Sequence, residues 1–272
     1  MSLDPRLTPL RDGIAARSLE GIVAAEVYLD PKAMACAVPA AAIRRAPDGA
    51  AEQLDQLLFG EAFAVIEEEG AFVWGQARRD GYVGFVEAQA LAPAGAPPSH
   101  RIASLRTYAF AEASIKSRAA GPYSLGALVT VEAEEGRLRR LAGAGWVPVE
   151  HLAPIGRFED DPAAVAERFL GAPYLWGGRE SLGLDCSGLV QQALMACGRA
   201  CPRDTDQQQA LGEAIGRQTF GRGDLVFWKG HVAMGLDGQR IVHANAHHMA
   251  VAIEPLDEAV ARIGEPVALR RP

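Results

Sequence analysis

Long apolar segments and a surplus of basic residues are both missing from this sequence of 272 residues. No apolar run is long enough to span a bilayer, and residues 1–21 carry charges throughout, without the apolar stretch of a signal peptide. We therefore expect a cytoplasmic protein with no membrane partner. The 27 Lys and Arg residues are outnumbered by 34 Asp and Glu, for a formal net charge of −7, which disfavours nucleic acid as a partner.

Cysteines are also few. The chain has four of them, and their spacing shows no disulfide framework, which suits a reducing compartment. Cys197 and Cys201 stand four residues apart, as zinc ligands can, but no matching pair follows. Buried structural thiols are the favoured interpretation of both residues, and we expect no metal and no other cofactor.

What is present is ordinary globular material, 49% hydrophobic and 22% charged, with room for two or more domains. Residues 1–36 form a lead-in segment to which no function can be assigned. Short strands and turns dominate from there to about residue 155, and helical periodicity begins at Asp161-Pro162, a capping carboxylate followed by proline. The pattern predicts an all-β region followed by an α+β domain at 156–272.

A weak internal repeat subdivides the all-β region. The segment that begins with Gly84-Phe85-Val86 aligns with the one that begins with Gly145-Trp146-Val147, an offset of 145 − 84 = 61 residues. Two copies of one small barrel are implied, at 37–95 and 100–155, joined by a Pro-rich and Ala-rich linker. Both copies resemble bacterial Src-homology-3-like barrels, whose last strands often carry this glycine–aromatic–valine pattern.

Cys186 has the setting of a nucleophile. It ends a glycine-rich loop and opens a segment whose apolar residues recur at helical spacing, from Leu189 to Cys197. A cysteine in the first turn of a helix lies among unpaired backbone N–H groups at the positive end of the helix dipole, which favours the thiolate. On this stretch alone, a small buried thiol is the alternative interpretation.

Two histidines supply partners for this cysteine. Residues 231–236 and 239–245 are predicted strands joined by an Asp-Gly turn, which places His231 and His243 on neighbouring strands. A cysteine nucleophile needs a base, and the base needs a third group to fix its ring, so Cys186, His231 and His243 fit these roles in that order. Other candidates for the third role are Asn245, His247 and His248.

Six motifs in order resemble those of the NlpC-type, papain-like cell-wall cysteine peptidases. They are PYLWGG (173–178), LDCSGLV (184–190), PRDTDQQ (202–208), GDLVFW (223–228), HVAMGL (231–236) and IVHAN (241–245). The resemblance implies a papain-like α+β domain in which Cys186 is the nucleophile, His231 the base and His243 the orienting residue. It also implies that Tyr174 helps to stabilise the oxyanion or to position substrate.

Peptidases of this type that carry two such barrels are murein-peptide recycling enzymes, the dipeptidyl-peptidase VI or γ-D-glutamyl-L-diamino acid endopeptidase type. Their first barrel helps to close the cleft, and an acidic residue can bind the free α-amine of the substrate. Residue matching suggests Glu61, Tyr82 and Asp185 for this function. The alternatives are a solvated turn residue for Glu61, a barrel-core aromatic for Tyr82 and a helix cap for Asp185.

Two more residues are candidates for substrate binding. Ser187 follows the nucleophile directly, and Arg203 in the PRDT segment can bind a substrate carboxylate. The alternative for Arg203 is a structural ion pair with Asp204 or Asp206.

The sequence therefore predicts a multidomain hydrolase: two small all-β barrels followed by a papain-like peptidase domain. The expected substrate is the murein peptide L-Ala-γ-D-Glu-diamino acid, from which the enzyme releases L-Ala-D-Glu. The identity of the diamino acid and the oligomeric state stay open. The alternatives are an amidase or acyltransferase on the same scaffold, and a wall-peptide binding module without catalytic activity.

Overall fold

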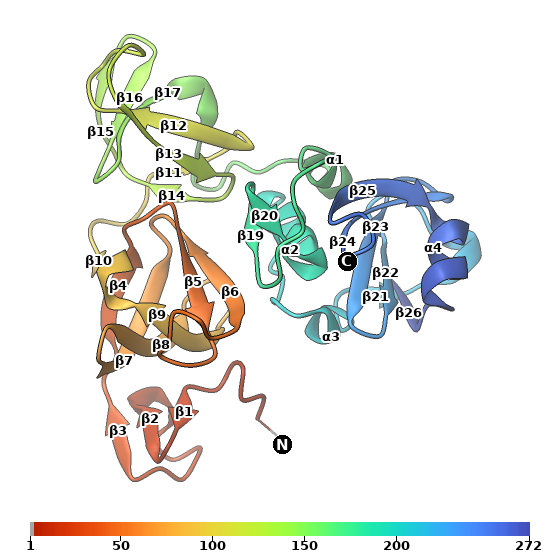
Figure 1. The fold of residues 1–272 in the computed structure, drawn as a ribbon, viewed down its shortest axis with the longest axis horizontal. Coiled ribbons are helices and arrows are strands. Elements are labelled where there is room, and N and C mark those ends of the chain that lie inside the picture. The colour runs from red at the N-terminus through yellow and green to blue at the C-terminus, as the bar shows by residue number, and fades with distance from the viewer. Residues whose placement is uncertain (1–2) are drawn as a thin grey trace. The chain divides into compact units, whose positions relative to one another are not determined.

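The chain divides into two compact units, Met1–Ile155 and Gly156–Pro272 (Figure 1). The computed structural model describes residues 3–272. Among these residues, no helix is both long and apolar enough to cross a membrane.

The first unit begins with a small three-stranded sheet. Its strands are β1 (Leu10–Arg11), β2 (Ile14–Ala16) and β3 (Val27–Leu29), and the 3-10 turn η1 (Arg17–Leu19) follows β2. The sequence predicts a partly helical lead-in whose apolar run at residues 21–29 is a strand or a packing segment. The structure has strands and one short turn of helix there, and β3 lies within that run.

A seven-stranded antiparallel sheet follows, in the order β10-β4-β7-β8-β9-β5-β6. Its elements are β4 (Lys32–Cys36), β5 (Ala40–Arg44), β6 (Gln53–Leu58), β7 (Ala62–Glu69), β8 (Phe72–Ala77), β9 (Val83–Glu87), η2 (Ala88–Ala90) and β10 (Leu91–Pro93). Alternate residues of β5 point inward, as a period of two requires. The centre of its core consists of four fully buried side chains: Ile43, Leu57, Phe63 and Val86.

The second half of the unit contains β11 (His100–Ile102), β12 (Arg106–Phe110), β13 (Ala119–Ser124), β14 (Leu128–Val129), β15 (Val131–Glu135), β16 (Leu138–Leu141), β17 (Gly145–Pro148), η3 (Val149–His151) and β18 (Leu152–Pro154). They form sheets in the orders β14-β11-β18 and β13-β12-β17-β16-β15. Each half ends in a strand, a 3-10 turn and a strand, in line with the sequence repeat. That the second half is a barrel of the same kind stays a prediction.

Gly60 lies where the two halves of this unit touch. Its φ is +75°, and a Cβ there would lie 1.9 Å from the carbonyl oxygen of Leu128. The backbone N–H of Leu128 donates to the carbonyl of Phe59 at 2.8 Å, which brings the two backbones together. Only glycine satisfies both the left-handed conformation and this close approach.

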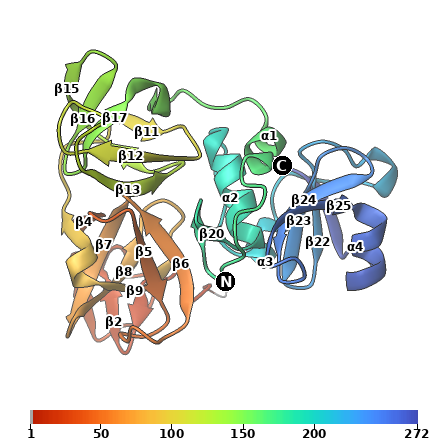
Figure 2. The same cartoon turned by 45° about the horizontal axis from the view of Figure 1, so that its top comes forward.

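The second unit is built on a six-stranded sheet in the order β21-β26-β22-β23-β24-β25. These strands are β21 (Glu213–Ala214), β22 (Leu225–Trp228), β23 (His231–Gly235), β24 (Arg240–Asn245), β25 (Ala250–Pro255) and β26 (Ala268–Arg271). The helices are α1 (Pro162–Glu167), α2 (Cys186–Ala196), α3 (Thr205–Gln208) and α4 (Leu256–Ile263). The short elements β19 (Arg179–Glu180), β20 (Gly183–Leu184) and η4 (Arg217–Thr219) complete the unit. Helices α2 and α4 lie on opposite sides of the sheet (Figures 1 and 2).

Two local predictions in this unit have clear outcomes. Asp161 caps α1 and accepts hydrogen bonds from the N–H groups of Ala163 and Ala164, so the helix start is confirmed. The sequence also predicts a second helix around Thr205–Ala214, and this prediction is too long, because α3 ends at Gln208. The chain turns at Gly212, where φ is +58° and a Cβ would lie 1.8 Å from the carbonyl oxygen of Arg271. The next two residues then pair with β26 as β21.

Candidate active site

Cys186 is the first residue of α2 and is 6% exposed. Asp185 caps the helix, and its carboxylate accepts a hydrogen bond from the N–H of Gly188 at 2.8 Å. The N-terminus of α2 packs closely on the preceding loop, since a Cβ at Gly188 would lie 2.3 Å from the carbonyl oxygen of Gly178. The glycines of the DCSG and PYLWGG motifs therefore let the loop bring the thiol to the helix terminus.

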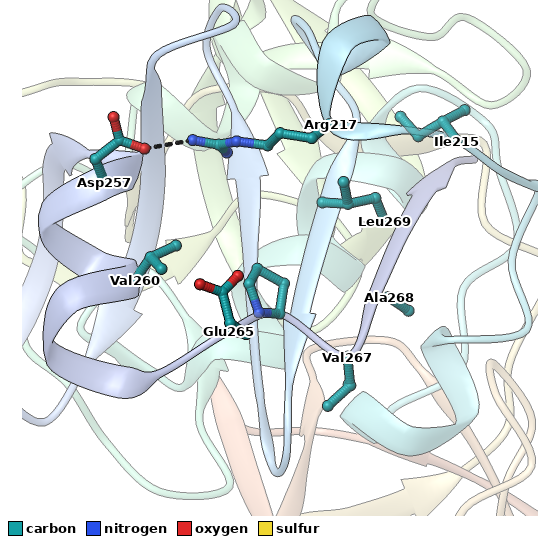
Figure 3. Close-up of a pocket in the computed structure, with 9 residues that line it drawn as sticks. Ile215, Arg217, Asp257, Val260, Glu265, Val267, Ala268 and Leu269 are labelled. Atoms are coloured by element: carbon teal, nitrogen blue, oxygen red, sulfur yellow. Dashed lines mark hydrogen bonds and ion pairs between the residues drawn. The ribbon is translucent and has the colours of Figure 1, made fainter.

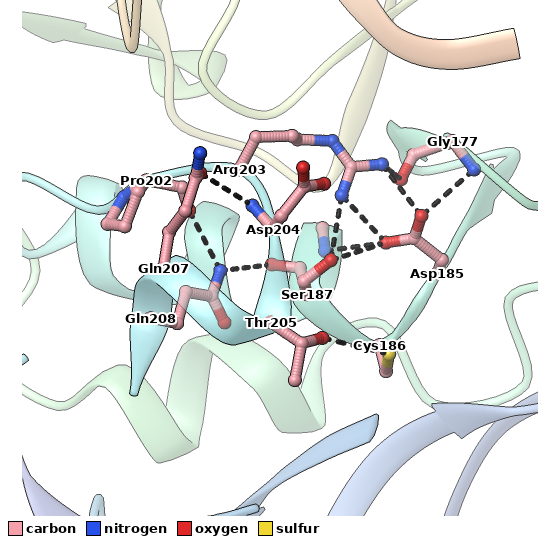
Figure 4. A network of polar contacts seen from close by, with 12 residues as sticks. Gly177, Asp185, Cys186, Ser187, Pro202, Arg203, Asp204, Thr205, Gln207 and Gln208 are labelled. Carbon is pink, nitrogen blue, oxygen red and sulfur yellow. Dashed lines mark hydrogen bonds and ion pairs between the residues drawn. The ribbon is translucent and has the colours of Figure 1, made fainter. Parts of the chain in front are cut away.

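A buried polar network holds this terminus in place (Figure 4). Arg203 donates to both oxygens of Asp185, at 3.0 and 2.7 Å, and to the hydroxyl of Ser187 at 2.8 Å. Asp185 also accepts from the N–H of Gly177 at 2.9 Å and from the hydroxyl of Ser187 at 3.2 Å. Arg203 is 1% exposed and Asp185 is 6% exposed. The two charges are therefore held by each other and by the helix cap.

This network changes the interpretation of three predicted substrate-binding residues. The cap alternative for Asp185 is confirmed, and both of its oxygens already accept several hydrogen bonds. The ion pair of Arg203 with Asp185 was not among the alternatives that the sequence suggested. Ser187 is 4% exposed within the same network. Contact of any of them with substrate stays a prediction.

The two predicted histidines lie side by side on the sheet. Nε2 of His231, at the start of β23, is 2.8 Å from Nδ1 of His243 on β24. The other predicted orienting candidates lie further along, where His248 and Asn245 contact each other at 3.0 Å. His243 is completely buried, so its ring is fixed by packing as well as by polar contacts. The catalytic roles assigned to His231 and His243 stay predictions.

Glu254 continues the row of polar side chains that begins with His231 and His243, and the sequence did not predict it. Its Oε1 lies 2.7 Å from Nε2 of His243, although the ring N–H is poorly aligned with that oxygen. Arg262 of α4 donates one hydrogen bond to each oxygen of this carboxylate, at 2.8 and 2.5 Å. Glu254 belongs to no motif, and the register of β24 on β25 is the one signal that points to it: Ile241 lies opposite Glu254.

Burial makes both partners of the expected proton transfer neutral at pH 7. It raises the pKa of the Cys186 thiol to about 11, and the charge of Asp185 acts in the same direction. The N–H of Val232 and the hydroxyl of Thr205 oppose this rise. Burial also lowers the pKa of His231 to about 4. The thiolate expected from the helix terminus is therefore not the resting form, because desolvation outweighs these opposing contacts.

Two further side chains approach the thiol. The Oγ1 of Thr205, the first residue of α3, lies 3.8 Å from Sγ of Cys186, a contact that sequence reasoning missed. The charges of Cys186 and Asp185 act on Tyr174, whose pKa burial raises to about 12, so its phenol stays protonated. A protonated phenol near the thiol can donate a hydrogen bond to an oxyanion, the role that the family resemblance implies.

Glu61 and Tyr82, the two candidates in the first unit, are both buried. Glu61 is 1% exposed, accepts from the N–H of Leu58 at 3.0 Å and pairs with Nε of Arg79 at 2.5 Å. The solvated-turn alternative for Glu61 is therefore wrong, because the side chain turns inward to these partners. Tyr82 is 4% exposed and packs in the core of the first half, as its alternative predicted. Substrate contacts by either residue stay predictions.

A separate hollow of about 500 Å³ lies between α4 and β26 (Figure 3). Ile215, Val260 and Leu269 contribute its apolar wall, and Arg217 pairs with Asp257 at 2.6 Å. None of the residues that line it is a cysteine, serine or histidine. Its titratable side chains are Arg217, Asp257 and Glu265, so it lacks the thiol and imidazole of the predicted site.

Among residues 3–272, one group of side chains could hold a metal ion: His243, His248 and Glu254, whose ligand atoms lie within 4.8 Å of one another. Two of these three residues already contact each other within the histidine row, and Arg262 holds the carboxylate. Their arrangement is accounted for by hydrogen bonding and ion pairing. Cys201 is buried and Cys197 is partly buried.

Helix α2, which begins at Cys186, packs on strands β23 and β24, which carry His231 and His243. Residues 171–262 match the NlpC/P60 family, and residues 43–91 match the bacterial dipeptidyl-peptidase Sh3 domain. The chain thus carries an NlpC/P60 domain of the cysteine peptidase type, preceded by an Sh3 domain.

Several proteins with known names are similar to this chain. The chain is 27% identical over 226 residues to the gamma-D-glutamyl-L-lysine dipeptidyl-peptidase of Bacillus subtilis, covering 75% of this chain and 76% of that protein. It is 34% identical over 106 residues to the Bacillus cereus protein of the same name, covering 36% of this chain but only 32% of that protein. A crystal structure of an NlpC/P60 family protein from Bacillus cereus has the same fold, with a TM-score of 0.78 at 21% identity, covering 88% of this chain and 99% of that one.

Proposed function

We propose that this protein is a cysteine peptidase that hydrolyses the γ-D-glutamyl-L-diamino acid bond of murein peptides with a free N-terminal L-Ala. The observation that carries the proposal is the position of Cys186 at the start of α2, together with the contact between His231 and His243. The names of two relatives support the choice of bond. The product is L-Ala-D-Glu, and the proposed setting is recycling of wall peptides in the cytoplasm.

The proposed acylation begins with a neutral thiol and a neutral histidine. Sγ of Cys186 attacks the γ-carbonyl carbon of D-Glu, and the thiol proton passes to Nδ1 of His231, because Nε2 is engaged by His243. The oxyanion accepts hydrogen bonds from N–H groups at the start of α2 and from the phenol of Tyr174. His231 then protonates the leaving amine as the carbon–nitrogen bond breaks. This leaves a thioester on Cys186.

Deacylation reverses the roles. Water attacks the thioester carbon, its proton passes to His231, and that proton returns to the sulfur as L-Ala-D-Glu leaves. Because proton transfer accompanies the attack, the raised pKa of Cys186 does not prevent catalysis and instead lowers its reactivity before substrate binds. We also propose that residues 100–155 form a second Src-homology-3-like barrel, which the repeated strand, 3-10 turn and strand support.

The experiment compares L-Ala-γ-D-Glu-L-Lys, the equivalent meso-diaminopimelate peptide and their N-acetylated forms. Each is incubated with the wild type and with Cys186→Ala, and the products are identified by mass spectrometry. Release of L-Ala-D-Glu from a free-amine peptide alone, lost in Cys186→Ala, is the expected result. Equal cleavage of the acetylated peptides would remove the free-amine requirement. Transfer of the acyl group to added hydroxylamine, with no hydrolysis, would favour the acyltransferase alternative.

A further inference from the structure

Four residues form a continuous polar row across unit two. His231 of β23 contacts His243 of β24, His243 contacts Glu254 of β25, and Glu254 is held by Arg262 of α4. Glu254 is 6% exposed, and His243 is fully buried. Ala233 of β23 and Ile241 of β24 share a hydrophobic cluster with Leu256 and Ala259 of α4. The helix that supplies Arg262 therefore packs on the strands that carry the two histidines.

We propose that Glu254 is a positioning residue that sets the tautomers of both histidines and so leaves the catalytic base able to accept a proton. The kinetic part of this inference rests on the proposed function, whereas the tautomers can be observed without any substrate. Glu254 touches no reacting atom and acts through His243. Arg262 fixes the direction of the carboxylate through its two hydrogen bonds.

The contact with Glu254 decides where the protons of both histidines lie. An ionised carboxylate only accepts hydrogen bonds, so Nε2 of His243, 2.7 Å from Glu254, must carry the ring proton. Nδ1 of the neutral His243 then has a lone pair, which accepts from Nε2–H of His231 at 2.8 Å. Nδ1 of His231 is left without a proton. That nitrogen is the one available to take the proton of the Cys186 thiol.

The opposite arrangement would block catalysis. If His243 carried its proton on Nδ1, it would donate to Nε2 of His231, and His231 would hold its own proton on Nδ1. The base would then present an N–H to the thiol. Fixing a histidine tautomer through a buried carboxylate is a known catalytic requirement, whose loss costs about 10⁴-fold in kcat when the carboxylate contacts the base directly. Glu254 is one histidine further away, and a loss of about 10- to 100-fold is expected.

Glu254→Gln tests the polarity of the contact while keeping the shape. Arg262 donates to both oxygens of Glu254, and one of them, Oε1, also faces Nε2 of His243. An amide at this position therefore sets an N–H group against one of these donors in either orientation, and the carboxylate that accepts from both is lost. Where the N–H group faces His243, Nε2 of His243 must accept, which moves its proton to Nδ1. Glu254→Asp keeps an acceptor and is the matched rescue. Asp257→Asn, which removes an arginine-paired carboxylate from the same helix α4, is the control.

The readout is the imidazole ¹⁵N spectrum of the full chain, which separates protonated from unprotonated ring nitrogens. Single histidine replacements assign the signals of the six histidines. We expect Nε2–H at both His231 and His243 in the wild type, Glu254→Asp and Asp257→Asn, and a population with Nδ1–H at His243 in Glu254→Gln. In kinetics with the murein peptide, Glu254→Gln lowers kcat with KM unchanged, and Glu254→Asp restores part of it.

The pH dependence of kcat/KM depends on the charged and titratable groups near His231. His231 is influenced by Arg262, Glu254 and Asp185, while His248 lies near Glu254 and Glu258 acts on Arg262. Loss of the Glu254 charge removes a contribution that raises the pKa of His231, so the acid limb of kcat/KM moves to lower pH in Glu254→Gln. Asp257→Asn should leave this limb in place.

Either of two results would overturn the inference: Nδ1–H at His243 in the wild type, or unchanged tautomers and kcat in Glu254→Gln. The first needs no variant and stands even if Glu254→Gln does not fold. If the wild type has the expected tautomers but cleaves no murein peptide, the positioning role is supported and the proposed substrate is wrong.

Discussion

The carboxylate of Glu61 lies 2.5 Å from Nε of Arg79, in a site where Glu61 is 1% exposed. Arg79 also donates to the carbonyl of Gly126 at 3.0 Å, in the other half of the same unit. The ion pair thus connects the two halves beside the close contact at Gly60. Glu61 has a structural function in this unit whether or not it also meets a substrate amine.

Glu61→Gln is therefore expected to destabilise the first unit by roughly 3 kcal/mol, since it leaves the Arg79 charge without its buried partner. Amide hydrogen exchange in β6 and β7 measures the local loss. The double variant with Arg79→Met should lose less than the sum of the two single variants, because the pair is removed together. A raised KM for free-amine peptides, with exchange unchanged, would instead favour the amine-binding role that the sequence suggested.

Thr205→Val should raise the pKa of the Cys186 thiol further, because the hydroxyl at 3.8 Å is one of the contacts that lower it. Alkylation by iodoacetamide between pH 7 and 10 reports the thiolate fraction, and it should slow about two- to tenfold, the effect of one weak hydrogen bond. Thr205→Ser keeps the hydroxyl and should react like the wild type. Equal rates for all three proteins would show that Thr205 does not act on the thiol.

Arg203→Leu should cost about 3 to 5 kcal/mol of the free energy of unfolding, because it leaves the Asp185 charge buried and unpaired. Arg240→Leu is the matched control, since the Arg240–Asp237 pair is exposed and should change stability by less than about 1 kcal/mol. Urea unfolding at pH 7 compares the two variants. Similar losses would mean that the Asp185 network is not a buried charge pair in energetic terms.

Acid should destabilise unit two through its buried histidines. Burial lowers the pKa of both His231 and His243 to about 4, so the unfolded chain binds protons at a higher pH than the folded one. Their contribution is therefore complete above pH 6.5 and is lost as the pH falls toward 4, by a few kcal/mol in total. Urea unfolding from pH 7 to pH 4.5 measures this slope. In the double variant His231→Gln/His243→Gln, the free energy of unfolding should depend less on pH than in the wild type. Parallel curves for the two proteins would show that these histidines do not cause the loss of stability in acid.

Features that depend on residues close together in the chain could be predicted from the sequence. The start of α2 at Cys186 and the start of α1 at Asp161 both depend on a capping carboxylate and the residues after it. The pairing of His231 with His243 was also predictable, because an Asp-Gly turn fixes how two short strands meet. In each of these cases, the chain segment that decides the outcome is shorter than about 15 residues.

Features that depend on packing between residues far apart in the chain could not be predicted from the sequence. Arg203 lies 18 residues from Asp185, and only the folded loop brings the guanidinium beneath the helix cap. Thr205 reaches the thiol from a separate short helix, whose end is fixed by the approach of β26 at Gly212. Burial, and with it the raised pKa of Cys186, depends on how the sheet covers the thiol. The local pattern around a helix terminus carries no information on that.

The row from His231 to Glu254 also limits how this domain can change in evolution. Its members stand on three consecutive antiparallel strands, where successive side chains point to opposite faces. One residue inserted into the turn between β24 and β25 would shift the pairing by one position and send residue 254 to the other face. The turns at 236–239 and 246–249 should therefore accept changes in length only when the strand pairing is preserved.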